Sequence, residues 1–274
     1  MAYDEAYRKA EWRIEATRLA NAINLDLNGF NLTELPESLS NLTLLQSLTL
    51  GNNNLTTLSE AQSLFITLTQ LQSLNLRFNQ LGTLPDWLGN LTQLSALDIS
   101  GNGLTKLPDF LNNLVQLKEL IFDFNSIDDI PEWLIKLKNM EWLSLNGNGF
   151  TDIPPFLIQL KYLKGIRLND NPLNPELSVA YAEGFESIKA YLRAKAAAQI
   201  TLDEAKLIII GEGEVGKSCL LSALRGDPFI EGLSTTHGIE IKPVKVLDPT
   251  DPDAQTEITL NAWDFGGQRV YRPT

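Results

Sequence analysis

The sequence has one cysteine, one histidine and no long apolar run. The single cysteine, Cys219, has no disulfide partner within the chain, which fits a reducing compartment and predicts a cytoplasmic location. The single histidine, His237, lies in no cluster of Cys or His residues, so a zinc site is not expected. No apolar run approaches the ~20 residues that a membrane-spanning helix needs, so no transmembrane segment is predicted.

Positive charge is also scarce. The chain has 22 Lys and Arg residues against 34 Asp and Glu residues, which gives a formal net charge of −12 at pH 7. Nucleic acids and anionic membranes are bound by basic surfaces that contact phosphates, so neither is expected as a partner. A chain of 274 residues is long enough for two domains.

Residues 23–173 repeat a leucine-rich unit of the form L-x-x-L-x-L-x-x-N. The asparagine recurs after 26 residues in the first interval and after 23 residues in each of the last four. It is found at Asn53, Asn79, Asn102, Asn125, Asn148 and Asn171. An earlier, terminal unit has Phe30 at this position. We therefore predict seven leucine-rich repeats.

Each repeat has an apolar face that only its neighbours can bury. In the fourth repeat we expect Leu97 and Ile99 in the core, Asp98 outside, and the amide of Asn102 bonded to neighbouring backbone. The prolines that follow the asparagines predict short 3₁₀ or extended segments on the convex side. The longer interval contains Ser59–Gln62, whose capping-box spacing predicts a short helix there.

The exposed strand positions include two large apolar residues, Ile121 and Trp142, close to Glu119 and Asp123. An exposed apolar spot with charges around it is typical of a binding surface. It indicates either a site for a protein partner or a contact with another part of the same polypeptide. The sequence leaves both interpretations open.

Helical segments are predicted at both ends of the repeats. Residues 1–22 have a helical pattern that offers apolar side chains to cover the first repeat, and they lack the apolar core of a secretory signal peptide. These apolar side chains are Tyr7, Trp12, Ile14 and Leu19. Residues 174–204 are expected to form a helical cap and a linker, with a helix that begins at Asn174 and Pro175.

Residues 205–274 begin with a phosphate-binding pattern. Gly211 to Ser218 reads GEGEVGKS, after an apolar run and before a helical segment, as a P-loop requires. Lys217 is expected to contact the β- and γ-phosphates, and the Ser218 hydroxyl to bind Mg²⁺. The predicted nucleotide-binding residues here are Gly211, Gly213, Glu214, Val215, Gly216, Lys217, Ser218 and Cys219.

Two shorter patterns in this region are typical of other folds. Gly211, Gly213 and Gly216 form a G-x-G-x-x-G, and residues 264–266 read DFG. A protein kinase would need a valine at the position of Ser218 and VAIK and HRD motifs, and all of these are absent. The sequence therefore favours a P-loop nucleotide-binding module over a kinase.

A second set of residues indicates nucleotide hydrolysis. The segment WDFGGQ follows an alternating strand, so Asp264 is placed to hold Mg²⁺ and Gly267 to contact a γ-phosphate. Gln268 comes next, where a GTPase needs a side chain that orients the attacking water. The predicted catalytic residues are Gln268 and Lys217.

Thr236 follows Lys217 by 19 positions, which fits a switch threonine that binds Mg²⁺ when a γ-phosphate is present. The predicted Mg²⁺ ligands are Ser218, Thr236 and Asp264. Residues 237–246 are expected to form an edge strand. Its apolar alternation changes phase across Pro243, which predicts a bulge there.

The P-loop, T-x-G-I and D-x-x-G-Q motifs, in this order, resemble the small G domains of the Ras-like class. With the repeats and the helical cap, essentially the whole chain resembles the bacterial Roco family. In that family, leucine-rich repeats precede a Roc G domain and a COR dimerisation domain. The motifs GEGEVGKSCLL, STTHGIEI and WDFGGQ match best.

The resemblance implies an α/β fold: a leucine-rich-repeat solenoid with an N-terminal helical cap, followed by a truncated P-loop (Ras-like) G domain. It also implies GTP or GDP with Mg²⁺ as cofactors, protein partners for the repeats, and homodimerisation of the full-length protein. The base-recognition motifs N-K-x-D and S-A-K do not occur before Thr274, so a preference for GTP over ATP is implied by the resemblance alone. We therefore expect a fragment of a larger protein, with catalysis only in the full-length form.

Three classes of function remain open. The first is a regulatory GTPase whose repeats couple the GTP cycle to a partner or to dimerisation. The alternative is a leucine-rich-repeat interaction module with a non-functional partial G domain. The third is a kinase, as in some eukaryotic relatives, which none of these residues supports.

Overall fold

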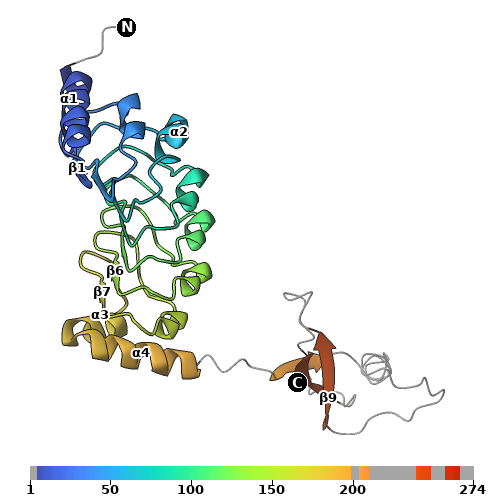
Figure 1. The fold of residues 1–274 in the computed structure, drawn as a ribbon. Coiled ribbons are helices and arrows are strands. Elements are labelled where there is room, and N and C mark those ends of the chain that lie inside the picture. The colour runs from blue at the N-terminus through green and yellow to red at the C-terminus, as the bar shows by residue number, and fades with distance from the viewer. Residues whose placement is uncertain (1–4, 199–203, 210–238, 248–256, 266–274) are drawn as a thin grey trace, which may run out of the picture. The chain divides into compact units, whose positions relative to one another are not determined.

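The computed structural model describes residues 5–198, 204–209, 239–247 and 257–265, and it divides the chain into two compact units (Figure 1). The first unit covers residues 1–198 and the second residues 199–274. The first contains the stacked repeats and the second a small sheet, so the α/β class predicted from the sequence is confirmed.

Seven short strands in the first unit form one parallel sheet in sequence order. Successive strands pair residue for residue, so equivalent positions of neighbouring repeats lie side by side. The strands are β1 (Asn24–Asp26), β2 (Ser47–Thr49), β3 (Ser73–Asn75), β4 (Ala96–Asp98), β5 (Glu119–Ile121), β6 (Trp142–Ser144) and β7 (Gly165–Arg167).

Short 3₁₀ helices lie on the other side of the repeats, as Figure 1 shows. They are η1 (Glu37–Asn41), η2 (Ser59–Ala61), η3 (Asp86–Asn90), η4 (Asp109–Asn113), η5 (Glu132–Lys136) and η6 (Pro155–Gln159). All but η2 begin directly after a proline in extended conformation, because the pyrrolidine ring holds φ at a value suited to that position. The 3₁₀ segments predicted from these prolines are confirmed.

The longer interval forms η2 and then α2 (Gln62–Phe65), so the predicted short helix is confirmed. The predicted capping box is wrong, because neither helix start has a side-chain capping bond. The Ser59 backbone N–H instead donates to the hydroxyl of Thr57 at 3.0 Å. The Ser59 N–H, which a capping box would bond to a side chain within the helix, is therefore bonded to a residue that precedes the helix.

The core runs along the inner side of the sheet. Its central column contains Leu25, Leu48, Leu74, Leu97, Leu120, Leu143 and Ile166, all of them buried. Ile99 is also buried, whereas Asp98 is only half-buried and Trp142 is 43 % exposed. The inward and outward positions predicted for the fourth repeat are therefore confirmed.

The predicted asparagine ladder is present. The Asn102 amide donates to the carbonyl oxygens of Ile99 (3.1 Å) and Ser100 (3.0 Å) in its own repeat and of Leu76 (3.0 Å) in the preceding one. Its side-chain oxygen accepts a hydrogen bond from the backbone N–H of Leu81 at 3.4 Å. The other ladder asparagines repeat this pattern, so each links two repeats.

The N-terminal cap is α1 (Glu5–Leu19). Tyr7 and Ile14 are buried as predicted, together with Ala10 and Thr17. Trp12 and Leu19, which were expected to cover the first repeat, are 71 % and 69 % exposed, so that expectation is wrong. The buried residues follow the three- and four-residue spacing of one helix face, and Trp12 and Leu19 lie off that face.

The C-terminal cap consists of α3 (Pro175–Glu183) and α4 (Phe185–Ala198). The predicted start of α3 is confirmed, because the Asn174 side chain accepts a bond from the N–H of Leu177 at 2.8 Å. A polar cluster joins α4 to the last repeat. In it, Asp152 accepts hydrogen bonds from the Tyr191 hydroxyl (2.8 Å) and Lys195 Nζ (2.6 Å).

The second unit contains β8 (Glu204–Ile209), β9 (Ile239–Leu247) and β10 (Glu257–Phe265), in the order β8-β10-β9. β10 is parallel to β8 and antiparallel to β9. The bulge predicted at Pro243 is wrong, because β9 and β10 pair without interruption and Pro243 lies opposite Asn261. β9 is at the edge of this sheet, where the missing N–H of a proline is tolerated.

The central column predicts a large cost for Leu97→Ala. Deleting the buried side chain leaves a cavity and should lower the free energy of unfolding by about 2–5 kcal/mol. Trp142→Ala, at an exposed position of the same face, should cost about 1 kcal/mol or less. Chemical denaturation of both variants measures the difference. If Trp142 proved the costlier loss, the strand positions assigned to the core would be wrong by one residue.

The polar cluster predicts a pH-dependent cap. Burial raises the pKa of Asp152, but hydrogen bonds from Lys195 and Tyr191 outweigh it, so the pKa lies below its ordinary value. A lowered pKa in the folded state stabilises the protein above the unfolded value of about 4, and this stabilisation is lost as the pH falls through the folded value.

Asp152→Asn should therefore cost about 1 kcal/mol at pH 6, a small value because partly exposed ion pairs are screened by water. The difference from the unsubstituted protein should shrink below pH 4. Thermal melts at pH 6 and pH 3.5 measure it. Glu186→Gln, which removes an exposed ion pair within α4, is the matched control and should leave the melting temperature unchanged. An Asp152→Asn effect of equal size at both pH values would contradict the assignment.

Candidate functional sites

The predicted nucleotide site begins where β8 and β10 end. The two strands are parallel, and Asp264 on β10 lies opposite Ile209, the last residue of β8. Gly211, the first residue of the phosphate-binding pattern, follows Ile209 by two positions. The carboxyl ends of parallel strands meet at one edge of a sheet, so Asp264 lies at the edge where β8 ends, two positions before Gly211 in the sequence. This is the arrangement that a phosphate and its Mg²⁺ ion require.

Of the predicted site residues, only Asp264 lies within the described part of the chain. The others lie outside it: Gly211, Gly213, Glu214, Val215, Gly216, Lys217, Ser218, Cys219, Thr236, Gly267 and Gln268. Their assigned roles stay predictions. Within the described residues, no group of three or more His, Cys, Asp or Glu side chains could hold a metal ion.

The second candidate site is on the exposed face of the repeat sheet. A shallow hollow of about 10 Å³ is lined by Glu119, Ile121, Trp142, Leu143, Ser144 and Arg167. Trp142 and Glu119 are paired residues of neighbouring strands. A Cβ atom at Gly165 would lie 2.5 Å from the Trp142 ring, so the glycine of the next strand makes room for the indole. The apolar spot predicted from the sequence is therefore present, with one acidic and one basic side chain around it.

Two aromatic residues at the edge of this face were missed from the sequence. Phe78 and Phe124 are 44 % and 53 % exposed, and their rings stack with centroids 6.2 Å apart. Both have positive φ, 50° and 53°, which is strained for a bulky side chain. Their rings occupy the space where Gly101 and Gly147 of the next repeats would carry a Cβ atom.

A sequence signal for these residues exists. They occupy the position directly before the ladder asparagine, where the backbone is left-handed in repeat after repeat. The residues at this position are Asn52, Phe78, Gly101, Phe124, Gly147 and Asp170. Phenylalanine is out of place among Gly, Asn and Asp, which adopt this conformation most readily.

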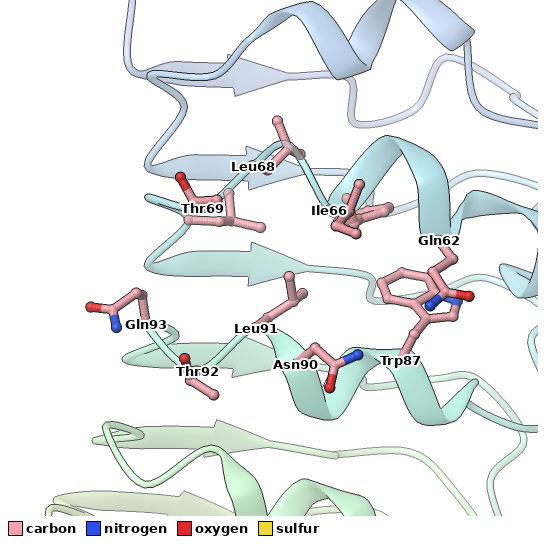
Figure 2. Close-up of a pocket in the computed structure, with 11 residues that line it drawn as sticks. Gln62, Ile66, Leu68, Thr69, Trp87, Asn90, Leu91, Thr92 and Gln93 are labelled. Carbon is pink, nitrogen blue, oxygen red and sulfur yellow. The ribbon is translucent and has the colours of Figure 1, made fainter.

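A third hollow, of about 240 Å³, lies on the convex side next to the longer interval (Figure 2). Ile66 from the inserted segment and Trp87 and Leu91 from the following repeat form its apolar lining. Amide and hydroxyl groups surround it, and none of its lining residues is charged. The Trp87 indole donates to the carbonyl oxygen of Leu58 at 3.2 Å, and its ring lies 4.8 Å from that of Phe65, so this wall is fixed in place.

None of the described helices has the length and apolarity that crossing a membrane requires.

Two family models match the chain. The model described as "Ras of Complex, Roc, domain of DAPkinase" matches residues 206–274, and a leucine-rich-repeat model matches residues 58–104. The first match covers both motif regions of the predicted nucleotide site, and the second lies within the predicted repeats.

Curated relatives match parts of the chain. A Roc-COR-CHAT protease of Runella zeae is 36 % identical over 97 residues, which are 32 % of this chain and 10 % of that protein. The Ras-related protein RABD2a of Arabidopsis thaliana is 37 % identical over 67 residues, which are 24 % of this chain and 30 % of that protein. The chain thus spans a tenth to a third of the length of these relatives.

Among solved structures, internalin C2 of Listeria monocytogenes is similar to 65 % of this chain, with a TM-score of 0.52 and 23 % identity over 79 % of its own length. That likeness shows the fold of the repeats. Leucine-rich repeats that precede a Roc segment, together with the similarity to bacterial Roc-COR-CHAT proteases, support a Roco-like chain.

Proposed function

We propose that the chain is part of a regulatory GTPase. Its Roc segment binds GTP or GDP with Mg²⁺, and its leucine-rich repeats bind a protein partner. The longer protein hydrolyses GTP and couples the nucleotide state to the partner. Homodimerisation of that protein and a cytoplasmic location remain expectations drawn from the resemblance and from the cysteine content.

The register between β8 and β10 carries this proposal. It pairs Asp264 with Ile209, two positions before the phosphate-binding sequence that starts at Gly211. The donor set fits the ion, since Mg²⁺ prefers carboxylate and hydroxyl oxygens and the predicted ligands Ser218, Thr236 and Asp264 offer these. Bound there, Mg²⁺ would neutralise charge on the phosphates.

The remaining roles rest on the sequence. Lys217 would bind the β- and γ-phosphates as a compact positive charge, and Gly267 would offer its N–H to the γ-phosphate. Gln268 would orient the attacking water. The base-recognition motifs do not occur within the 274 residues. The guanine nucleotide is therefore supported by the similarity to Ras-related proteins over 67 residues.

The alternative is an interaction module in which only the repeats act and the partial G domain does not. The two hypotheses differ in one measurable property, which is nucleotide binding that depends on Lys217.

Lys217→Ala should weaken GTP and GDP binding by about tenfold or more in a longer protein that completes the Roc domain. The substitution removes a charge-assisted contact to the phosphates. Titration with a fluorescent guanine nucleotide measures the affinity. Lys138→Ala, an exposed lysine of the repeats, is the matched control and should bind as the unsubstituted protein does. Equal nucleotide affinities of the two variants would contradict the assignment of Lys217 to a P-loop.

Single-turnover GTP hydrolysis separates binding from catalysis. The 274-residue chain should show no appreciable hydrolysis, because phosphoryl transfer depends on positioned charges and this chain lacks the base-recognition motifs. In the longer protein, Gln268→Leu should slow hydrolysis by about tenfold or more and leave nucleotide affinity within about twofold. Hydrolysis by the short chain at the rate of the longer protein would contradict the account, as would an unchanged rate in Gln268→Leu.

A further inference from the structure

We propose that the exposed face of repeats four to six binds an extended, positively charged peptide segment of a partner protein. This inference rests on the proposed protein-binding role of the repeats and is independent of nucleotide binding. The surface in question, called the acidic aromatic face below, consists of Asp98, Glu119, Asp123, Phe124 and Trp142.

Uncompensated negative charge is the first observation. Asp98 hydrogen-bonds to Asn75 and Ser100, and Asp123 to Asn146, but these partners are neutral. The Glu119 carboxylate has no side-chain hydrogen bond within the described residues. None of the ion pairs of the repeat unit involves these three carboxylates. A cationic ligand would gain from all three charges.

The nearby lysines do not neutralise this charge. Lys118 and Lys164 both form ion pairs with Glu141, which lies outside the acidic aromatic face. Their positive charges are therefore paired with Glu141 and not with the carboxylates of the acidic aromatic face. Among the residues that the structure describes, Arg167 is the one basic residue that lines the hollow, so the three carboxylates leave this face with net negative charge, which attracts and orients a basic segment.

The aromatic rings are the second observation. Trp142 lies against Gly165 and Phe124 against Gly147, so in each case a glycine of the next repeat leaves room for the ring. One side of each ring is thereby supported by backbone, and the exposed remainder is open to a ligand. Cations of Lys and Arg are attracted to such ring faces, most strongly to that of Trp. Glu119 on the strand next to Trp142 would supply the charge-assisted hydrogen bond.

Backbone strain indicates that Phe124 is not there for stability. Its φ of 53° is unfavourable for a phenylalanine, and the equivalent positions of other repeats carry Gly, Asn or Asp. Strain of this kind is found where a side chain serves binding. Phe78, two repeats earlier, has the same conformation and stacks on Phe124, which extends the aromatic edge.

The placement of these residues fixes the shape of the ligand. Asp98, Glu119 and Trp142 lie on β4, β5 and β6, so a ligand that contacts all three must extend across the strands. Arg167 lines the same hollow as Trp142 on the C-terminal side. Basic side chains are therefore expected over Asp98 and Glu119, and a neutral or acidic one beside Arg167. A polysaccharide would also stack on the rings, but three uncompensated carboxylates favour a cationic peptide.

Fluorescence anisotropy with two labelled peptide pools tests the proposal on the full 274-residue chain. Each pool contains 12-residue peptides with random uncharged residues at every second position. The other positions are Lys or Arg in the basic pool and Asp or Glu in the acidic pool. In 50 mM NaCl the basic pool should bind at least tenfold more tightly than the acidic pool, and raising the salt to 500 mM should weaken this binding.

Three variants assign the binding to the face. Trp142→Ala, and Glu119→Gln combined with Asp123→Asn, should each weaken binding of the basic pool at least fivefold. Phe124→Asn should also weaken it but melt at the same temperature or higher, because asparagine relieves the strain at positive φ. If Phe124 had a purely structural role, the substitution would lower the melting temperature together with peptide binding. The matched controls are Trp12→Ala on α1 and Asp86→Asn on η3, which should bind normally.

Each outcome decides the proposal. Equal binding of both pools, or losses in the controls as large as in the three variants, would overturn it. Binding of the acidic pool that depends on Trp142 would overturn the charge assignment and leave the protein-binding role of the repeats in place. If neither pool bound and a soluble polysaccharide bound through Trp142, both the inference and that role would fail, while the nucleotide-binding proposal would be unaffected.

Discussion

The hydrogen bonds of the ladder asparagines hold the repeat unit together. Each asparagine amide satisfies carbonyl groups of its own turn and of the preceding one, as Asn102 does for Ile99, Ser100 and Leu76. Each of these carbonyl groups also accepts a second hydrogen bond, so a bond from the asparagine amide adds about 0.5–1.5 kcal/mol. The leucine column supplies most of the buried apolar surface, but apolar contacts alone are non-directional. The ladder fixes the register in which the repeats stack.

That register places the candidate binding face. Because strands β1 to β7 pair residue for residue, equivalent outward positions form straight rows across the repeats. A large ring in one repeat then lies next to the same position in the following repeat, and a glycine there gives it room, as Gly165 does for Trp142. In the second unit, the parallel register of β8 and β10 pairs Asp264 with Ile209, two positions before Gly211 in the sequence.

Much of this fold follows from the sequence because the repeats are periodic. A period of 23 residues and a buried Leu97 are consequences of one stacked unit, and both hold. The prediction fails where two local patterns compete. Trp12 is apolar and helical but lies off the buried stripe, and Pro243 changes the apolar phase without a bulge because an edge strand accepts it. Phe78 and Phe124 were missed because a strained φ cannot be inferred from hydrophobicity alone. Of the predicted nucleotide site, only Asp264 lies within the described residues, and its assigned role stays a prediction.

The ladder itself is tested most directly by Asn102→Ala. The account predicts a loss of at least about 2 kcal/mol in the free energy of unfolding, because the Leu81 N–H loses its acceptor and three carbonyl groups each lose one of two hydrogen bonds. Hydrogen exchange should also quicken at the Leu81 amide, which donates to this side chain. Asn113→Ala, at the end of η4, is the control and should leave both quantities unchanged. A variant as stable as the unsubstituted protein, with unchanged exchange at Leu81, would show that the leucine core alone sets the register of the repeats.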